Sequence, residues 1–376
     1  MKKKRMLSLR VSAALLLAVV LLLDGAFVLA RDRAYSPAEN RNLQQFPSLS
    51  PGALTSGRFE SRFDDYVADQ FPLRDGWIAV KAFSDRLLGR TEANGVYLGR
   101  DGYLLQKFTA PDAAAEQATL DALRAFCAAH AGLNLYAMIA PSAMTVCPEK
   151  LPAFAPRGDE SAYMDRLRDG LAGSPVTWIE LRDALRAESQ MYYRTDHHWT
   201  TDAALLAYRA FASAAGLEAA EFDRQVLTDA FSGTLTASSG YRAGETDVIA
   251  AYLPRRAVSH VVTYVAEGER RASVYCPEKL EERDKYTVFF GGNHPRVDIE
   301  TAAEGERRLL LVKDSYANCF APFLIPNYQK IVIVDPRYFT DDLLSLIEAE
   351  RITDVLFLYN AQTLAADTAL RADLTG

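Results

Sequence analysis

The chain has 376 residues, 49% of them apolar and 24% charged, which is the composition of a globular protein with one large domain or two smaller ones. Residues 1–30 contain five of the 42 basic residues and one of the 49 acids, so the remaining chain has a net charge of −11. An acidic body argues against a nucleic-acid partner and favours a neutral or locally bound substrate.

The first thirty residues have the composition of a targeting segment. A basic start is followed by an apolar run, Val11–Leu23, which Asp24-Gly25 interrupts before apolar residues resume up to Ala30. The pattern fits either a signal peptide cleaved after Ala30 or an uncleaved signal anchor, because the whole stretch is long enough to cross a bilayer. In both cases the basic end stays in the cytoplasm and the remainder is exported.

Residues 31–112 are expected to form a stalk, followed by two helices and a hairpin that pack on the core. Residues 31–50 are polar and interrupted by prolines. Apolar residues at 59, 63, 66 and 67 have helical spacing, and this helix ends before Pro72. A second helix is predicted over residues 76–88. Two apolar runs around Asp101-Gly102 predict a β-hairpin over residues 94–105.

From residue 113 onward, helices and apolar strands alternate. The predicted strands cover residues 134–140, 176–179, 309–312, 331–334 and 355–359. The predicted helices cover residues 113–131, 161–169, 180–187, 343–350 and a segment that Thr200, Thr201 or Asp202 caps and that runs to about 215. The last three strands are apolar on both faces, as in a parallel sheet with helices on each side. We therefore expect residues 113–376 to form one α/β domain.

The segment from about 217 to 285 interrupts this alternation. Residues 258–265 and 272–275 alternate like strands of an antiparallel insertion. Residues 286–290 are expected to form a further strand that ends at Gly291-Gly292-Asn293. The sequence therefore predicts an α/β domain with a small antiparallel insertion.

The chain has five histidines, and two of them are adjacent in Asp196-His197-His198-Trp199. On an extended loop, residues two apart point the same way, so Asp196 can hold the imidazole of His198 while His197 points away. Two alternatives stay open for this stretch. One is a metal site made by Asp196 and both histidines, although adjacent histidines chelate one ion poorly. The other is a capping aspartate beside a packed histidine and tryptophan.

Ser315 follows the apolar strand 309–312, after Lys313-Asp314 and before a predicted helix. A serine at such a turn places its hydroxyl at the carboxyl edge of the sheet, where open α/β folds bind ligands. Backbone N–H groups at the start of the helix can stabilise an oxyanion there. The alternative is that Ser315 is an ordinary N-cap and that Asp314 fixes the turn.

Four further residues are candidates for the oxyanion hole or for substrate contacts. Gly292 and Asn293 follow the predicted strand 286–290, although a simple tight turn explains them equally well. Arg337 follows the strand 331–334, and Asn360 follows the strand 355–359, so both lie at the same sheet edge as Ser315.

The four cysteines, Cys127, Cys147, Cys276 and Cys319, allow three disulfide connectivities in an exported chain. The alternative, which we favour, is that they are small buried apolar residues. Their spacing contains no Cys-x-x-Cys pair and gives no indication of a metal site.

The segment Tyr193-Arg194-Thr195-Asp196-His197-His198-Trp199-Thr200 resembles the signature of bacterial DHHW proteins. Further motifs agree with that family and span nearly all of residues 36–360: Glu39-Asn40-Arg41, Asp69-Gln70-Phe71-Pro72-Leu73-Arg74, Gly291-Gly292-Asn293, Lys313-Asp314-Ser315-Tyr316-Ala317 and Asp335-Pro336-Arg337-Tyr338. The family is similar to a branch of the SGNH-like proteins that O-acetylate alginate and related exopolysaccharides.

This resemblance implies an SGNH-hydrolase-like (flavodoxin-like) α/β fold and a triad of Asp196, His198 and Ser315. In that group an Asp-x-His motif precedes the nucleophilic serine. In ordinary SGNH esterases the serine comes first and an Asp-x-x-His comes last, so the fold and the triad transfer to this chain more directly than the substrate does.

The sequence therefore predicts an exported, membrane-anchored or secreted enzyme that transfers acyl (acetyl) groups to a cell-surface or secreted polysaccharide, with no cofactor and no metal. The donor is expected to come from a membrane acyl-donor protein, because acetyl-CoA is cytoplasmic. Two alternatives stay open. One is a carbohydrate esterase with the same triad, and the other is a non-catalytic surface or spore-coat protein that retains the fold.

Overall fold

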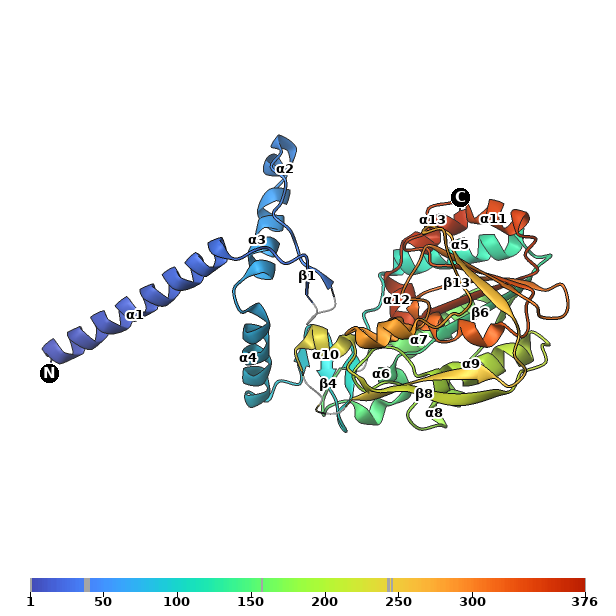
Figure 1. The fold of residues 1–376 in the computed structure, drawn as a ribbon, viewed down its shortest axis with the longest axis horizontal. Helices are drawn as coiled ribbons and strands as arrows, with labels where there is room; N and C mark the ends of the chain where they lie inside the picture. The colour runs from blue at the N-terminus through green and yellow to red at the C-terminus, as the bar shows by residue number, and fades with distance from the viewer. Residues whose placement is uncertain (1, 37–40, 157, 242–243, 245, 376) are drawn as a thin grey trace. The chain divides into compact units, whose positions relative to one another are not determined.

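The computed structural model describes residues 2–36, 41–156, 158–241, 244 and 246–375. The chain divides into two compact units, Met1–Arg90 and Thr91–Gly376 (Figure 1). The predicted hairpin falls in the second unit. The domain boundaries expected after residues 30 and 112 stay predictions.

The first unit begins with the long helix α1 (Lys2–Leu29), which continues through Asp24-Gly25. Among the described residues, Arg10–Leu29 is the one helical stretch long and apolar enough to cross a membrane, and none of it is buried. A signal sequence would have the same properties. The short strands β1 (Tyr35–Ser36) and β2 (Arg41–Asn42) pair antiparallel.

Helices α2 (Pro51–Thr55), α3 (Arg58–Gln70) and α4 (Arg74–Leu87) complete this unit, close to the predicted positions. The end of α3 is tied to the preceding segment, because Asp69 accepts a hydrogen bond from the backbone N–H of Gln44 at 2.7 Å. The side chain of Gln70 bonds the backbone of both Arg33 and Gln44. The two polar residues before Pro72 therefore have a structural role. Glu39 and Asn40 lie outside the described residues.

The core of the second unit is an eight-stranded sheet in the order β11-β10-β12-β14-β13-β15-β6-β7. Its parallel part consists of β6 (Asn134–Ala140), β7 (Val176–Trp178), β13 (Arg308–Lys313), β14 (Lys330–Val334) and β15 (Asp354–Asn360). Residues 309–312 of β13 are fully buried, as expected for a strand covered on both faces.

The register places the carboxyl ends of these strands at one edge of the sheet. Ala140 of β6 is opposite Asn360 of β15, and Leu358 of β15 is opposite Lys313 of β13. The residues that follow β6, β13 and β15 therefore leave the sheet at the same edge, which is where open α/β folds bind ligands.

Helices form layers against this sheet. The helices α5 (Ala113–Ala129), α11 (Leu343–Ala349) and α13 (Ala369–Thr375) lie on one side of β6 and β13 in Figure 1, and α8 (Arg182–Arg186) and α9 (Thr201–Ala214) lie on the other. The remaining helices of the α/β part are α6 (Ala143–Val146), α7 (Glu160–Leu171) and α12 (Ala361–Ala366). Thr200 is the N-cap of α9, because its Oγ1 accepts from the N–H of Ala203 at 3.3 Å.

The segment between α9 and β13 differs from its prediction. β8 (Phe222–Phe231) and β9 (Asp247–Pro254) pair as a small antiparallel sheet, separated by α10 (Thr234–Ser239). In contrast, β10 (His260–Tyr264), β11 (Glu269–Arg271) and β12 (Arg296–Thr301) extend the central sheet antiparallel instead of forming an insertion. The strands predicted over 272–275 and 286–290 were wrong, because β11 ends at Arg271 and Lys285–Val288 is a 3₁₀ turn.

The remaining predictions concern the hairpin and the cysteines. β4 (Val96–Leu98) and β5 (Leu104–Gln106) form the predicted antiparallel hairpin, and β3 (Glu92–Ala93) adds a third strand. All four cysteines are free, and Cys127, Cys276 and Cys319 are buried, as the favoured interpretation expected.

Candidate active site

Three side chains from two distant segments form a continuous hydrogen-bonded chain at the carboxyl edge of the sheet. Nδ1 of His198 lies 2.6 Å from Oδ1 of Asp196, and Nε2 of His198 lies 2.7 Å from Oγ of Ser315. Asp196 and His198 are almost completely buried, whereas Ser315 is partly exposed. The order carboxylate, imidazole and hydroxyl is the order that a nucleophilic serine requires.

The loop that carries Asp196 and His198 is fixed from two sides. Directly after it, α9 begins at the Thr200 cap. Directly before it, the carboxylate of Asp247 accepts hydrogen bonds from the backbone N–H groups of Arg194 and Thr195, each at 2.8 Å, and from the Thr195 hydroxyl at 2.5 Å. Asp247 lies at the start of β9, so the small antiparallel sheet braces this loop.

The second carboxylate oxygen of Asp196 is also occupied. Oδ2 accepts from the backbone N–H of Thr234 at 2.8 Å and from the Thr234 hydroxyl at 2.9 Å. Burial alone would raise the pKa of Asp196, but the nearby His197 and His198 and these hydrogen bonds hold it well below its usual range. Asp196 is therefore an ionised carboxylate in a fixed orientation, suited to orienting an imidazole.

Ser315 occupies a tight turn after β13. Oδ1 of Asp314 accepts from the N–H of Tyr316, and its Oδ2 accepts from the N–H of Asn360, both at 2.9 Å. The following segment consists of short 3₁₀ turns, Ser315–Asn318 and Ala321–Leu324, instead of the predicted helix. Asp314 is the N-cap of the first turn, so Ser315 is not the N-cap that the alternative interpretation assumed.

Aromatic side chains pack around the imidazole of His198. The ring of Tyr286 stacks on it with centroids 3.9 Å apart, and the Tyr286 hydroxyl donates to the carbonyl oxygen of Ser315 at 3.0 Å. Nε1 of the fully buried Trp199 donates to the carbonyl oxygen of Tyr316 at 2.9 Å. The Tyr316 hydroxyl donates to the carbonyl oxygen of His197. These contacts hold the two halves of the site together.

Asn293 lies near the buried end of β13. Its Oδ1 accepts from Nζ of Lys313 at 3.2 Å and from Nδ2 of Asn318 at 3.1 Å, so its own amide N–H₂ group points away from the ammonium. Lys313 also lies 3.2 Å from Oδ2 of Asp335. Gly292, in contrast, donates its N–H to the carbonyl oxygen of Phe289 at 3.3 Å. Of these two oxyanion candidates, Asn293 retains a side-chain donor.

The other two candidates at this edge, Arg337 and Asn360, also differ in their exposure and hydrogen-bond partners. Arg337 makes a two-pronged ion pair with Asp335, at 2.8 and 2.7 Å, and remains partly exposed. Asn360 is buried, and its side chain accepts from the N–H of Gln362 and donates to the carbonyl oxygen of Ala140. These two bonds tie Asn360 to the turn, and a contact between Asn360 and a substrate stays a prediction.

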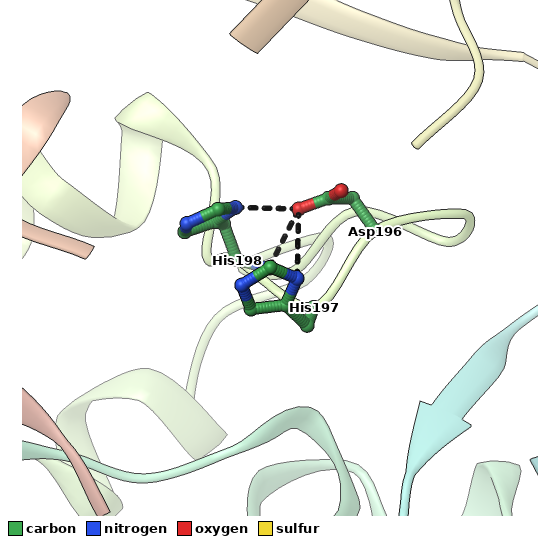
Figure 2. Close-up of side chains that lie close together, drawn as sticks. All are labelled: Asp196, His197 and His198. Atoms are coloured by element: carbon green, nitrogen blue, oxygen red, sulfur yellow. Dashed lines mark hydrogen bonds and ion pairs between the residues drawn. The ribbon is translucent and has the colours of Figure 1, made fainter. Parts of the chain in front are cut away.

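His197 lies beside His198 instead of pointing away from the site, with ring centroids 3.9 Å apart (Figure 2). Its Nδ1 lies 2.8 Å from the Thr234 hydroxyl and 3.7 Å from Oδ1 of Asp196. Burial of most of its surface, together with His198, lowers the pKa of His197 to about 4. His197 is therefore a neutral side chain that lines the site beside His198.

The same three residues are the one group within the described part of the chain that has metal-ligand composition and spacing. However, Nδ1 of His198 and Oδ1 of Asp196 are at hydrogen-bond distance, and Thr234 occupies the other carboxylate oxygen. A metal ion between these groups would displace the hydrogen bonds that order the loop. The arrangement therefore favours a proton-transfer site over a metal site.

Sequence reasoning missed four residues that shape the site: Gly233, Thr234, Asp247 and Tyr286. Gly233 donates its N–H to the Thr195 hydroxyl at 2.9 Å. All four come from the segment between α9 and β13. A serine-glycine-threonine turn and short apolar runs do not specify a distant partner. Residue pattern alone therefore does not identify these four residues.

Comparisons with known proteins agree with this architecture. Residues 96–275 match the sequence model of the family described as an SGNH hydrolase-like domain, acetyltransferase AlgX. The structure is similar to a DHHW family protein from Eubacterium siraeum, with a TM-score of 0.63 and 24% identity over 74% of this chain and 95% of that protein. It is also similar to Bacillus cereus PatB1 solved with a sulfonyl adduct, with a TM-score of 0.61 and 22% identity over 73% and 97%.

No curated protein sequence matches the chain. The structural matches nevertheless define the class: the protein has an SGNH hydrolase-like fold, and the predicted fold class is confirmed. Within that class, the resemblance to DHHW proteins and to the AlgX type of acetyltransferase domain is confirmed as well.

Proposed function

We propose that this protein is a serine-dependent O-acyltransferase that acetylates an extracytoplasmic polysaccharide. The observation that carries the proposal is the chain of contacts from Asp196 through His198 to Ser315, with distances of 2.6 and 2.7 Å. Such an arrangement activates a hydroxyl that is otherwise a weak nucleophile.

In the first half-reaction, Oγ of Ser315 attacks the carbonyl carbon of the acetyl donor, and its proton passes to Nε2 of His198. The bond from the carbonyl carbon to the donor oxygen then breaks, and the donor leaves with the proton from His198. Asp196 keeps the imidazole oriented and stabilises its positive charge. The result is an acetyl ester on Ser315.

In the second half-reaction, a sugar hydroxyl attacks this ester and gives its proton to His198. The bond to Oγ breaks, and the proton returns to Ser315. The backbone N–H of Ser315 and the side-chain amide of Asn293 are the donors we assign to the oxyanion. Asn293 suits this role because Lys313 and Asn318 occupy its carbonyl oxygen, which directs its amide away from them.

Three observations support the acceptor and the compartment. The match over residues 96–275 is to a family described as an SGNH hydrolase-like acetyltransferase domain. The motifs resemble those of DHHW proteins, and that resemblance implies O-acetylation of exopolysaccharides. The acidic body fits a neutral glycan better than a polyanion. The apolar helix Arg10–Leu29 fits a signal anchor or signal peptide, which would bring the domain to a membrane acyl-donor protein.

The test uses the full chain in detergent with an activated acetyl ester, in the presence and absence of oligosaccharides. Acetylated sugar in excess of free acetate supports the transferase. Acetate alone supports a carbohydrate esterase with the same triad. Neither product from folded protein contradicts the proposal and favours a non-catalytic surface protein. Ser315→Ala should abolish either product, whereas Ser213→Ala, at an exposed serine of α9, should change neither.

A further inference from the structure

A surface cavity of about 340 Å³ lies between the β4–β5 hairpin and the segment that follows α6. Its walls are formed by Arg100 of the hairpin and by residues 148, 149 and 151–155. The volume is within the range of small-molecule pockets. None of these residues takes part in the mechanism above.

Phe154 stands at this cavity with its side chain completely exposed. Its backbone is in the left-handed region, with φ at 62°, which is unfavourable for a bulky residue. An aromatic ring held in water by an unfavourable backbone conformation stabilises nothing in the fold. Strain of this kind at an exposed aromatic residue points to a function for the ring.

Close contacts join the hairpin to Lys150, four residues before Phe154. The backbone N–H of Arg100 donates to the carbonyl oxygen of Lys150 at 2.7 Å, and Nζ of Lys150 lies 2.6 Å from Oδ2 of Asp101. A Cβ at Gly99 would lie 2.6 Å from that same carbonyl oxygen, so only glycine permits this close approach. The hairpin and the segment 148–155 therefore present a preformed surface.

This surface is connected to the loop that carries Asp196. The ring of Tyr103 lies 5.5 Å from Nζ of Lys150 and 5.9 Å from the guanidinium of Arg194, two residues before Asp196. The N–H of Leu104 donates to the carbonyl oxygen of Arg194 at 2.7 Å. In addition, the segment 141–155 leaves the sheet after β6, at the edge where Ser315 lies.

We propose that this cavity, with Phe154 as its stacking platform, is a subsite for sugar units of the polysaccharide beyond the unit that is acetylated. The weakly positive C–H face of a pyranose ring fits the negative face of an aromatic ring. Arg100 and Glu149 supply charged groups for hydroxyls at the rim. A lipid surface suits the site less well, because both charges would lose water on insertion.

This inference rests on the proposed function for its substrate, but it is tested by binding. The full chain and its variants Phe154→Ala, Phe154→Trp and Val226→Ala are applied to immobilised cellulose-, chitin- and alginate-type oligosaccharides of increasing length. Val226 is an exposed apolar residue of β8 and serves as the control. Thermal unfolding of each variant checks the fold.

We expect the wild type to bind a longer oligosaccharide more tightly than a shorter one, and Phe154→Ala to lose about tenfold in affinity for the longer one. Phe154→Trp and Val226→Ala should bind like the wild type. Turnover of a small acetyl ester should be the same in all four proteins, so a failed triad and a failed subsite give different results. Three results would overturn the proposal. The first is wild-type glycan binding by Phe154→Ala, and the second is a Phe154→Ala protein that loses binding to phosphatidylcholine vesicles and not to glycan. The third is a wild-type protein that binds no glycan.

Discussion

Gly233 lies so close to Asp196 that no side chain fits between them. A Cβ at Gly233 would stand 2.7 Å from Cα of Asp196 and 2.5 Å from its Oδ2, and nearer still to its Cβ. The backbone of Gly233 has φ at −83°, which any residue adopts, so the glycine is required for space and not for its conformational freedom. The close approach lets Thr234 hold the carboxylate that orients His198.

Gly233→Ala should therefore displace Asp196 and lower kcat for an acetyl ester by about 100-fold, because small misplacements of catalytic groups have costs of this size. The control is Gly132→Ala, where a Cβ has no neighbour within 4 Å. Thermal unfolding and turnover of both variants are measured together. Wild-type turnover by a folded Gly233→Ala protein would show that the position of Asp196 does not matter.

The folded protein should become less stable as the pH falls from about 6.5 to about 4. Burial and the neighbouring His198 lower the pKa of His197 to about 4, so folded His197 stays neutral while the unfolded chain takes up a proton below about 6.5. The unfolded state then binds more protons, and the free energy of unfolding rises with pH across this window.

Urea unfolding at several pH values, for the wild type and His197→Gln, measures this effect. Groups that do not contact His197 contribute equally to both proteins and cancel in the difference, and the pKa of its neighbour Asp196 lies well below this window. The variant should lose less stability than the wild type on acidification. Equal losses in the two proteins would mean that His197 does not keep a lowered pKa.

Trp199→Phe should destabilise the second unit by about 1–3 kcal/mol, because the buried carbonyl oxygen of Tyr316 would lose the indole donor and keep only the weak thiol donor of Cys319. The fully buried indole also leaves a space that a smaller ring does not fill. Tyr338→Phe removes a polar atom from a half-exposed ring and should change stability by less than about 0.5 kcal/mol. Denaturant unfolding of both variants tests the contrast, and equal effects would argue against a bracing role for Trp199.

The parallel sheet was predictable because its strands are apolar on both faces. Residues 309–312, 331–334 and 355–359 have this pattern, and each forms a buried strand. Residues 286–290 are also mostly apolar and are expected to form a strand, but Lys285–Val288 forms a 3₁₀ turn. There, the stacking of Tyr286 on His198 and its bond to Ser315 override a five-residue pattern.

The contact between Asp196 and His198 was predictable from local geometry, because residues two apart on an extended loop share a side. The groups that fix this pair were not. Thr234 and Asp247 lie 38 and 52 residues from the loop residues that they bond. Their residue types indicate only a turn and the start of a strand. Such long-range partners follow from tertiary packing, which spacing along one chain does not encode.

The central claim is that Ser315 forms an acyl ester. The most direct measurement is the intact mass of the full chain after brief exposure to an activated acetyl ester, for the wild type, Ser315→Ala and Ser213→Ala. We predict an added mass of about 42 Da, one acetyl group, on the wild type and on Ser213→Ala, and none on Ser315→Ala. The same adduct on Ser315→Ala, or no adduct and no turnover from folded wild type, would contradict a covalent serine mechanism.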